Sequence, residues 1–239
     1  MDDSTSMIER DVEACTEARI DLIRNDPILI ERISEGGAFG GKNSRAASVA
    51  MFSRDHPGAV EDLRAKAHVV EVAPRSWLMR LPIVNSAVFE TDAGLLVCDT
   101  GMAPAGPALL GAIRSVSDAP IHTIVYSHGH VDHAYGTWAL LEDAATMAAG
   151  PPAIVAHRKV AERFAYYLRL RGMVARYMNQ PPDHLPASEE DFVWPTVEFD
   201  DVLRLDIGGE TVHLVHHPAE TDDQCYVWLP DRQALYSAD

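Results

Sequence analysis

The sequence predicts an α/β (α+β) fold in which antiparallel strands come first and alternating strands and helices follow. Between His68 and Cys98, short apolar runs separated by turn residues indicate an antiparallel meander. From residue 105 onward, segments with helical periodicity alternate with short apolar strands, as in a sheet that is covered by helices. A histidine-rich segment stands directly after one of these strands. The pattern therefore predicts a domain whose chemistry lies in loops at the carboxyl ends of strands.

Residues 1–66 are expected to form an N-terminal helical extension to a main domain at 67–239. Apolar residues at helical spacing in 6–34, broken by Pro27, indicate one or two short amphipathic helices. The glycine run at 36–41 suits a flexible connection. It is not expected to be a phosphate loop, because it lacks the GK[ST] ending and no strand precedes it.

The main domain is expected to begin with four short strands and to continue with alternating helices and strands. The strands are predicted over residues 68–72, 76–81, 83–90 and 95–98, with a hairpin turn at 91–94. The next elements, in chain order, are a helix at 105–116, a strand at 121–126, a helix at 135–148, a strand at 153–156 and a helix at 158–171.

A helical insertion of about residues 158–180 is rich in arginine and tyrosine. Its arginines would suit recognition of a sulfate or carboxylate group if the insertion overhangs the functional site; a solvated helix face over packed aromatic residues is the alternative. Strands at 202–205 and 211–215 follow, and a hairpin pairs 225–229 with 234–237. Because the chain ends at Asp239 directly after a strand, we expect the fold to be C-terminally incomplete.

The composition is that of an ordinary globular protein, with 47% hydrophobic and 23% charged residues among 239. The length fits one large domain, or one domain with an added segment. A formal net charge of -16 leaves no basic surface for phosphate groups, so no nucleic-acid partner is expected. Cys15, Cys98 and Cys225 are widely spaced and form no CxxC pair, which disfavours a disulfide framework and a four-cysteine zinc site.

A cytoplasmic location is expected. The first fifteen residues are acidic and lack the basic and apolar regions of a secretory signal. No apolar run approaches the roughly 18 residues that a membrane-spanning helix needs, so no membrane partner is expected either.

The segment His128-Gly129-His130-Val131-Asp132-His133 follows the predicted strand 121–126. A spacing of two in an irregular loop lets His128 and His130 converge on one ion. Asp132 and His133 can then turn toward a second ion beside it. Neutral imidazole and carboxylate are ligands that divalent zinc, iron or manganese accept, so the segment predicts a metal site rather than a surface loop rich in histidine.

An HxHxDH motif at the end of a strand resembles that of the metallo-β-lactamase superfamily. The resemblance spans roughly residues 68–239 and implies an αβ/βα sandwich. It also implies that Asp99, in Asp99-Thr100-Gly101, is a buried acid that orients the metal-binding loop. Asp-Thr-Gly is the active-site triplet of aspartic proteases as well, but that chemistry needs two such carboxylates and this chain has one copy.

The third ligand of the first ion is expected in the segment His216-His217-Pro218-Ala219-Glu220-Thr221. Alignment on the proline places Glu220 where the superfamily usually has a histidine. A carboxylate at this position resembles the alkylsulfatase-like branch, whereas His216 or His217 is the alternative ligand. Asp239, 19 residues beyond Glu220, matches the position of a carboxylate that bridges both metals in the superfamily. The family's last ligand, a histidine further downstream, has no counterpart.

The resemblance implies a metal-dependent hydrolase with two divalent ions, zinc being the first expectation. His128, His130 and Glu220 would bind one ion, and Asp132 and His133 the other, with Asp239 between them. A hydroxide held by both ions would attack the ester centre, and Asp132 would accept a proton from this nucleophile.

The expected partner is a small-molecule ester, with sulfate esters as the leading class. Lactone, thioester or β-lactam hydrolysis on the same scaffold, oxygen or persulfide chemistry with iron, and a non-catalytic metal-binding relative are the alternatives. A homodimer is left open, because sulfatase-like relatives often carry a dimerisation region and none is visible here.

Overall fold

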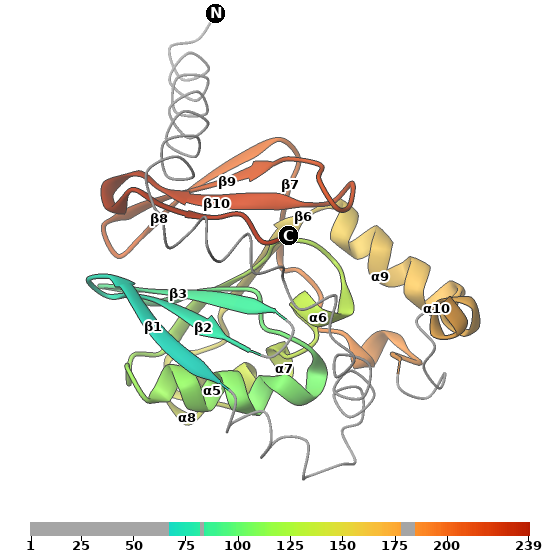
Figure 1. Cartoon of the computed structure of the whole chain (residues 1–239), viewed down its shortest axis with the longest axis horizontal. Coiled ribbons are helices and arrows are strands. Elements are labelled where there is room, and N and C mark those ends of the chain that lie inside the picture. Colours follow the sequence, from blue (N-terminus) through green and yellow to red (C-terminus); the bar gives the residue numbers. More distant parts are fainter. Residues whose placement is uncertain (1–66, 82–83, 178–184) are drawn as a thin grey trace, which may run out of the picture.

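The computed structural model describes residues 67–81, 84–177 and 185–239. The predicted extension at 1–66 and residues 178–180 of the predicted insertion lie outside the described residues. Two β-sheets stack face to face, and helices α5, α7 and α8 lie on the far side of the larger sheet (Figure 1). The described part is therefore the predicted mixed α/β architecture.

The larger sheet changes from antiparallel to parallel strands halfway across. It contains, in spatial order, β1 (His68–Ala73), β2 (Ser76–Arg80), β3 (Asn85–Thr91), β4 (Gly94–Cys98), β5 (Ile121–Tyr126), β6 (Ala153–His157) and β7 (Val197–Phe199). Strands β1 to β4 form the predicted meander, and β4 to β7 run parallel. Because β4 and β5 are parallel neighbours, the residues that follow them, from Asp99 and from Ser127, emerge at the same edge of the sheet.

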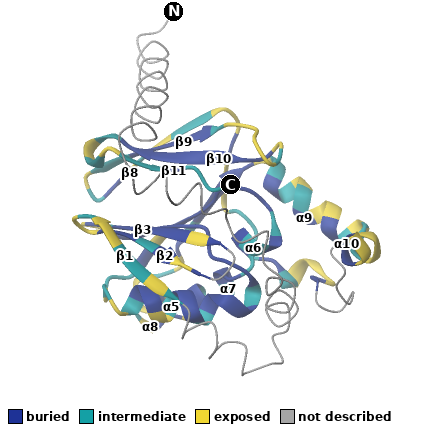
Figure 2. Cartoon of the chain, in the orientation of Figure 1, coloured by how far each residue is buried: buried dark blue, intermediate teal, exposed yellow. Residues whose placement is uncertain are grey.

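The second sheet is an antiparallel meander that closes over the first. Its strands, in spatial order, are β11 (Ala234–Tyr236), β10 (Cys225–Leu229), β9 (Glu210–His216) and β8 (Val202–Ile207). Side chains at alternate positions, such as Leu214 and Val227, pack against Phe89, Leu96 and Val125 of the larger sheet. Figure 2 shows the facing strands β3 and β10 as mostly buried. Burial of each such side chain stabilises the stack by roughly 1.5–3 kcal/mol.

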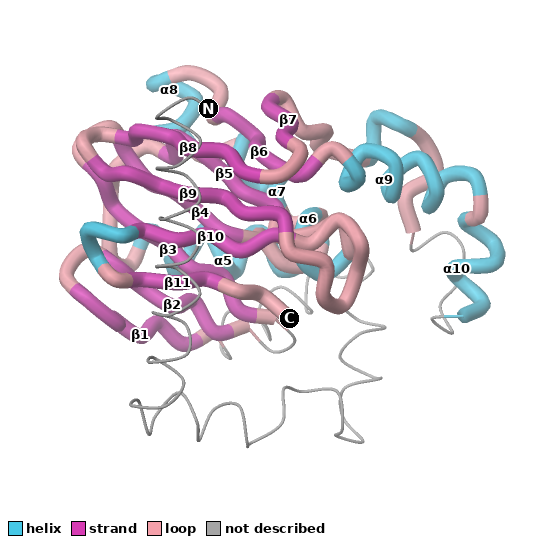
Figure 3. Tube along the Cα trace, turned by 90° about the horizontal axis from the view of Figure 1, so that it is seen from above, coloured by secondary structure: helices cyan, strands magenta, loops and turns pink. Residues whose placement is uncertain are grey.

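The helices are shorter than the sequence indicates. They are η1 (Ala103–Ala105), α5 (Gly106–Arg114), α6 (Val131–Ala134), α7 (Thr137–Leu141), α8 (Ala144–Ala149), α9 (Lys159–Arg169), α10 (Arg171–Tyr177), η3 (Glu189–Asp191) and η4 (Pro230–Arg232). Figure 3 shows α9 and α10 beyond the end of the sheets where α6 lies. Among the described residues, no helix is long and apolar enough to cross a membrane.

The prediction of one continuous helix at 135–148 was wrong. Asp143 is the N-cap of α8, where its Oδ2 accepts a hydrogen bond from the Thr146 amide at 3.0 Å. The same carboxylate is paired with Arg114, 2.6 Å away. This cap satisfies an amide that has no partner within the helix, so the chain starts a new helix here. The predicted helix at 158–171 likewise ends at Arg169, and α10 begins two residues later.

Gly136 lets the loop after β4 lie directly against the chain between α6 and α7. Its amide donates to the Gly101 carbonyl at 2.8 Å, and the Thr100 amide donates to the His133 carbonyl at 2.7 Å. A Cβ atom at Gly136 would lie 2.0 Å from the Thr100 carbonyl oxygen. The glycine is therefore needed for contact between the Asp99 loop and α6.

Substitution Gly136→Ala is expected to destabilise the fold by at least about 2 kcal/mol, because the added methyl group overlaps backbone atoms that cannot move independently. Gly172→Ala is the matched control, since a Cβ atom at this exposed position in α10 meets nothing within 4 Å. The control is expected to be neutral or to stabilise the protein by up to about 1 kcal/mol. Thermal unfolding of both variants measures the difference, and equal melting temperatures would contradict the steric argument.

Candidate metal centre

The histidine-rich segment starts at the carboxyl end of β5 and runs into α6. His128 is fully buried, His130 is the N-cap residue of α6, and α6 itself carries Asp132 and His133. The backbone is extended at His130, with φ -71° and ψ 154°, and becomes helical at Val131. This change directs the side chains before and after it to different places. The short helix thus separates the pair His128 and His130 from the pair Asp132 and His133.

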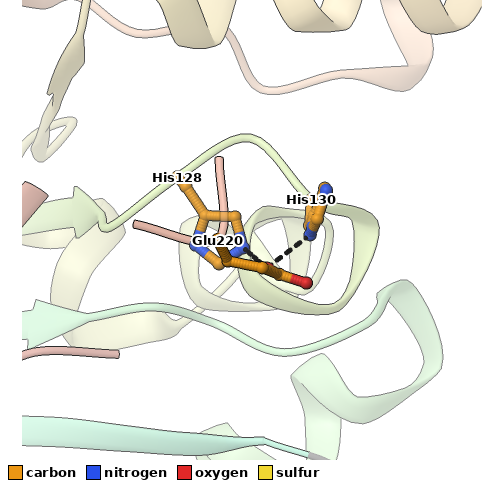
Figure 4. A group of neighbouring side chains, drawn as sticks. All are labelled: His128, His130 and Glu220. Atoms are coloured by element: carbon orange, nitrogen blue, oxygen red, sulfur yellow. Dashed lines mark ion pairs between the residues drawn. The ribbon is translucent and has the colours of Figure 1, made fainter. Parts of the chain in front are cut away.

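One cluster joins His128 and His130 to Glu220, which comes from the loop between β9 and β10. The Glu220 Oε2 atom lies 3.1 Å from His128 Nε2 and 3.0 Å from His130 Nδ1. Figure 4 shows the carboxylate reaching both imidazole rings. The three ligand-type atoms lie within 4.8 Å of one another, a grouping that could hold a metal ion.

A second cluster joins His128 and His133 to Asp239, again within 4.8 Å. Asp239 Oδ2 lies 3.5 Å from His133 Nε2, and Asp132 Oδ2 lies 3.8 Å from the same nitrogen. The two clusters share His128, so they are adjacent. Asp132 stands beside the second cluster rather than within it.

The donor atoms of these clusters fit a cation. His128 Nε2 and His133 Nε2 are buried, and neither makes a hydrogen bond within the described part of the chain, although carboxylate oxygens lie 3.1 Å and 3.5 Å from them. A buried polar atom without a partner is costly, about 1–3 kcal/mol, so two of them beside carboxylates call for a ligand. Burial, followed by the charge of His133, lowers the pKa of His128 to about 3. The ring is therefore neutral at physiological pH, which is the form that binds metal.

Asp99 orients the histidine segment, as the sequence resemblance implied. It is fully buried, and its Oδ1 accepts the Ser127 amide at 2.7 Å. Its Oδ2 accepts the Ser127 hydroxyl at 2.6 Å, His133 Nδ1 at 2.7 Å and the Tyr236 hydroxyl at 2.7 Å. Because Nδ1 of His133 is engaged, Nε2 is the nitrogen that faces the cluster.

Burial on its own would raise the pKa of Asp99, but the charge and hydrogen bond of His133 outweigh it and hold this pKa below its usual value. The carboxyl group is therefore ionised at neutral pH and acts only as an acceptor. This charge state matches the four donors that surround it.

His216 and His217, the alternatives to Glu220, belong to neither cluster. His216 stacks on His157 with ring centroids 3.8 Å apart, and its Nε2 donates to the Asp222 carbonyl at 2.9 Å. His217 lies against the Tyr226 ring at 6.1 Å. Of the three residues, Glu220 is the one that the structure brings to the histidines.

Arg163, an arginine of the predicted helical insertion, is already paired with acidic side chains. This side chain forms ion pairs with Asp222 at 2.8 Å and with Asp223 at 2.9 Å. These ion pairs favour a structural role for Arg163 over recognition of a substrate.

The sequence analysis gave no role to Gln224, which connects the main chain at Glu220 to the main chain at Asp239. Gln224 Oε1 accepts the Glu220 amide at 3.1 Å, and Nε2 donates to the Asp239 carbonyl at 2.6 Å. It also missed the Tyr236 hydroxyl on Asp99. The role of each residue depends on a contact with another segment of the fold: Gln224 with Asp239, and Tyr236 with Asp99.

The model of the Metallo-beta-lactamase superfamily matches residues 79–239. A linear primary-alkylsulfatase from a Pseudomonas species is 28% identical over an alignment of 171 residues, and the match covers 64% of this chain and 32% of that protein. The chain thus spans about a third of the length of this curated relative.

Three solved structures share the fold. A double mutant of the sec-alkyl sulfatase PisA1 has a TM-score of 0.59 and 21% identity, covering 95% of this chain and 43% of that one. A metallo-beta-lactamase with a HARLDQ motif from Cronobacter sakazakii has a TM-score of 0.54 and 21% identity, covering 72% and 62%. A B3 metallo-beta-lactamase described as having an active-site glutamic acid has a TM-score of 0.51 and 22% identity, covering 75% and 63%.

Proposed function

This chain belongs to the metallo-beta-lactamase superfamily, and from that premise we propose that it is a hydrolase that uses two divalent metal ions, zinc first, on small-molecule sulfate esters. The observation that carries the proposal is the Glu220 carboxylate, 3.1 Å from His128 Nε2 and 3.0 Å from His130 Nδ1. Two imidazoles and a carboxylate with room for a further ligand are a common set at catalytic zinc sites.

We assign His128, His130 and Glu220 to the first ion. The second ion is assigned to His133 and Asp132, with Asp239 between the two. Support comes from the shared position of His128 in both clusters and from the unpartnered Nε2 atoms of His128 and His133. When bound, such ions would supply a hydroxide nucleophile at neutral pH and a Lewis acid for the ester oxygen.

Other residues of the chain orient the proposed ligands, and one accepts a proton. Asp99 fixes the His133 ring, and Gln224 fixes the backbone of Glu220 relative to Asp239. Asp132, whose side chain is 15% exposed, is the residue we assign to accept a proton from the nucleophile. Glu220 in place of an imidazole adds a negative charge, which would moderate the Lewis acidity of the site.

Sulfate esters are proposed because a relative that matches 64% of this chain is a linear primary-alkylsulfatase. A β-lactam is the second candidate, since a structural neighbour described as a B3 metallo-beta-lactamase has an active-site glutamic acid. A glutamate ligand is therefore compatible with either reaction. Lactone and thioester hydrolysis, iron chemistry and a non-catalytic role are alternatives that the fold does not separate.

A substrate panel tests the proposal. Zinc-loaded protein is incubated with dodecyl sulfate, a lactone, a thioester and nitrocefin, and kcat/KM is measured for each. We expect inorganic sulfate release to be the fastest reaction and to stop after metal removal by a chelator. Faster nitrocefin turnover would favour the second candidate, and no turnover of any compound would contradict the hydrolase proposal.

A cytoplasmic location and a homodimer stay predictions. The fold and the site do not depend on either.

A further inference from the structure

We propose that Asp223 is a positioning residue of the metal centre, which fixes the main chain between His128 and His130 and is itself held by Arg163. The inference rests on the metal binding proposed above and names two residues that are not among the proposed metal ligands.

Asp223 contacts the main chain at Gly129, the residue between His128 and His130. Its side chain is fully buried, and Oδ2 accepts a hydrogen bond from the Gly129 amide at 2.8 Å. Gly129 separates His128 from His130, so a displacement of its amide would move both imidazoles. A Cβ atom on Gly129 would lie 3.0 Å from Asp223 Oδ2 and 3.0 Å from Arg163 Cδ. The main chain is therefore in close contact with both side chains.

Arg163 holds the other oxygen of the carboxylate. Its Nε donates to Asp223 Oδ1 at 2.9 Å, and its Nη2 donates to Asp222 Oδ1 at 2.8 Å. A buried carboxylate is strongly unfavourable without a charged partner, and Arg163, 20% exposed, supplies one from α9. Lys159, one turn earlier in α9, pairs with Asp222 at 3.2 Å.

Three separate segments meet at this carboxylate: the loop after β5, helix α9 and the loop between β9 and β10. Figure 1 shows α9 at the end of the sheets where these loops emerge. Glu220 lies only three residues before Asp223 in the same loop, and its carboxylate faces the histidines that flank Gly129. Asp223 thus sets the distance between Glu220 and the histidine pair. Partners of this kind typically contribute 10–100-fold to metal affinity.

The test uses the full chain with zinc alone as the probe. Asp223→Asn keeps the size of the side chain but leaves an amide that cannot satisfy the Gly129 and Arg163 donors together. Arg163→Met removes the charge and keeps the aliphatic stem, whereas Arg163→Lys restores the charge. Asp222→Asn is the matched control, because Asp222 also pairs with Arg163 but its side chain is 65% exposed.

Zinc affinity is measured by competition with a chelator. The absorption spectrum of the cobalt-substituted protein reports metal coordination, and the melting temperature of the metal-free protein reports stability.

We expect Asp223→Asn and Arg163→Met to weaken zinc binding about 10–100-fold and to change the cobalt spectrum. Arg163→Lys should recover part of the loss, and Asp222→Asn should stay within about threefold of the wild type. Unchanged zinc affinity and spectrum in both Asp223→Asn and Arg163→Met, even with lower melting temperatures, would overturn the inference. If Asp223→Asn does not fold, the two Arg163 variants decide by the same criteria.

Failure of the inference is distinguishable from failure of the proposed function. A wild-type chain that binds no zinc would overturn both. A wild-type chain that binds zinc, with variants that bind it equally well, would overturn the positioning role alone.

Discussion

Replacing His128 with alanine is expected to abolish hydrolysis. His128 is the member common to both clusters, it is fully buried, and its Nε2 has no hydrogen-bond partner in the described residues. Its removal would take a ligand from the first proposed ion and would also remove a member of the second cluster. The fall in kcat/KM should therefore exceed about a hundredfold, the upper range for loss of a residue that merely orients a ligand. Steady-state kinetics on the metal-loaded variant measure it.

The matched control is His122→Ala, in the neighbouring strand β5. The His122 ring is exposed and its Nδ1 contacts only the Thr123 hydroxyl, at 2.8 Å, among the contacts described. We expect kcat/KM within about twofold of the wild type, because His122 belongs to neither cluster; loss of its contact with the buried Thr123 hydroxyl should affect stability and not turnover. Unchanged turnover in a folded His128→Ala protein would refute the assignment of the site.

Asp99→Asn is expected to produce the second largest effect, on both stability and metal binding. Asn has one oxygen and one NH₂ group, so at least one of the Ser127, His133 and Tyr236 donors would face another donor. Breaking a buried charge network of this kind costs about 3–5 kcal/mol. The His133 ring would also lose the partner that fixes its orientation, and metal affinity should fall about 10–100-fold.

Asparagine is the informative substitution at this position because Asp99 has a φ of 59°, in the left-handed region that Asn tolerates. The loss therefore reports on the carboxylate and not on backbone strain. Asp92→Asn is the control, since Asp92 is 80% exposed and forms a surface ion pair with Arg75. Such a pair contributes about 0–1 kcal/mol, so chemical denaturation should separate the two variants clearly. Equal stability and equal zinc affinity would contradict the role given to Asp99.

The sequence predicted most of the fold because strand patterns and turns are local. The meander at 68–98, the strand at 121–126 and the two hairpins of the second sheet were confirmed to within a few residues. Strand β7 was missed, since it has only three residues and two of them are exposed. Its place depends on pairing with β6. The break before α8 was missed although its N-cap, Asp143, bonds to Thr146 only three residues away; the pairing of this carboxylate with Arg114, 29 residues distant, is not visible in the sequence.

Candidate ligands could be proposed from the sequence where ligand types cluster. The segment 128–133 has four of them in six positions, and the proline at 218 was enough to favour Glu220 over its neighbouring histidines. The residues that support the site were not predictable in this way. Asp223 acts on Gly129 from 94 positions away, and Tyr236 acts on Asp99 from 137 positions away. Single aspartates and tyrosines are too common in sequences for such partners to be recognised before the fold is known.

Metal content per chain tests the central claim most directly. Protein purified without added metal and then equilibrated with zinc is analysed by plasma mass spectrometry, beside the His128→Ala variant. The account predicts about two tightly held divalent ions per wild-type chain and loss of at least the first ion, which His128 binds, in the variant. A wild-type chain that holds no tight metal, or a variant that holds as much as the wild type, would contradict it.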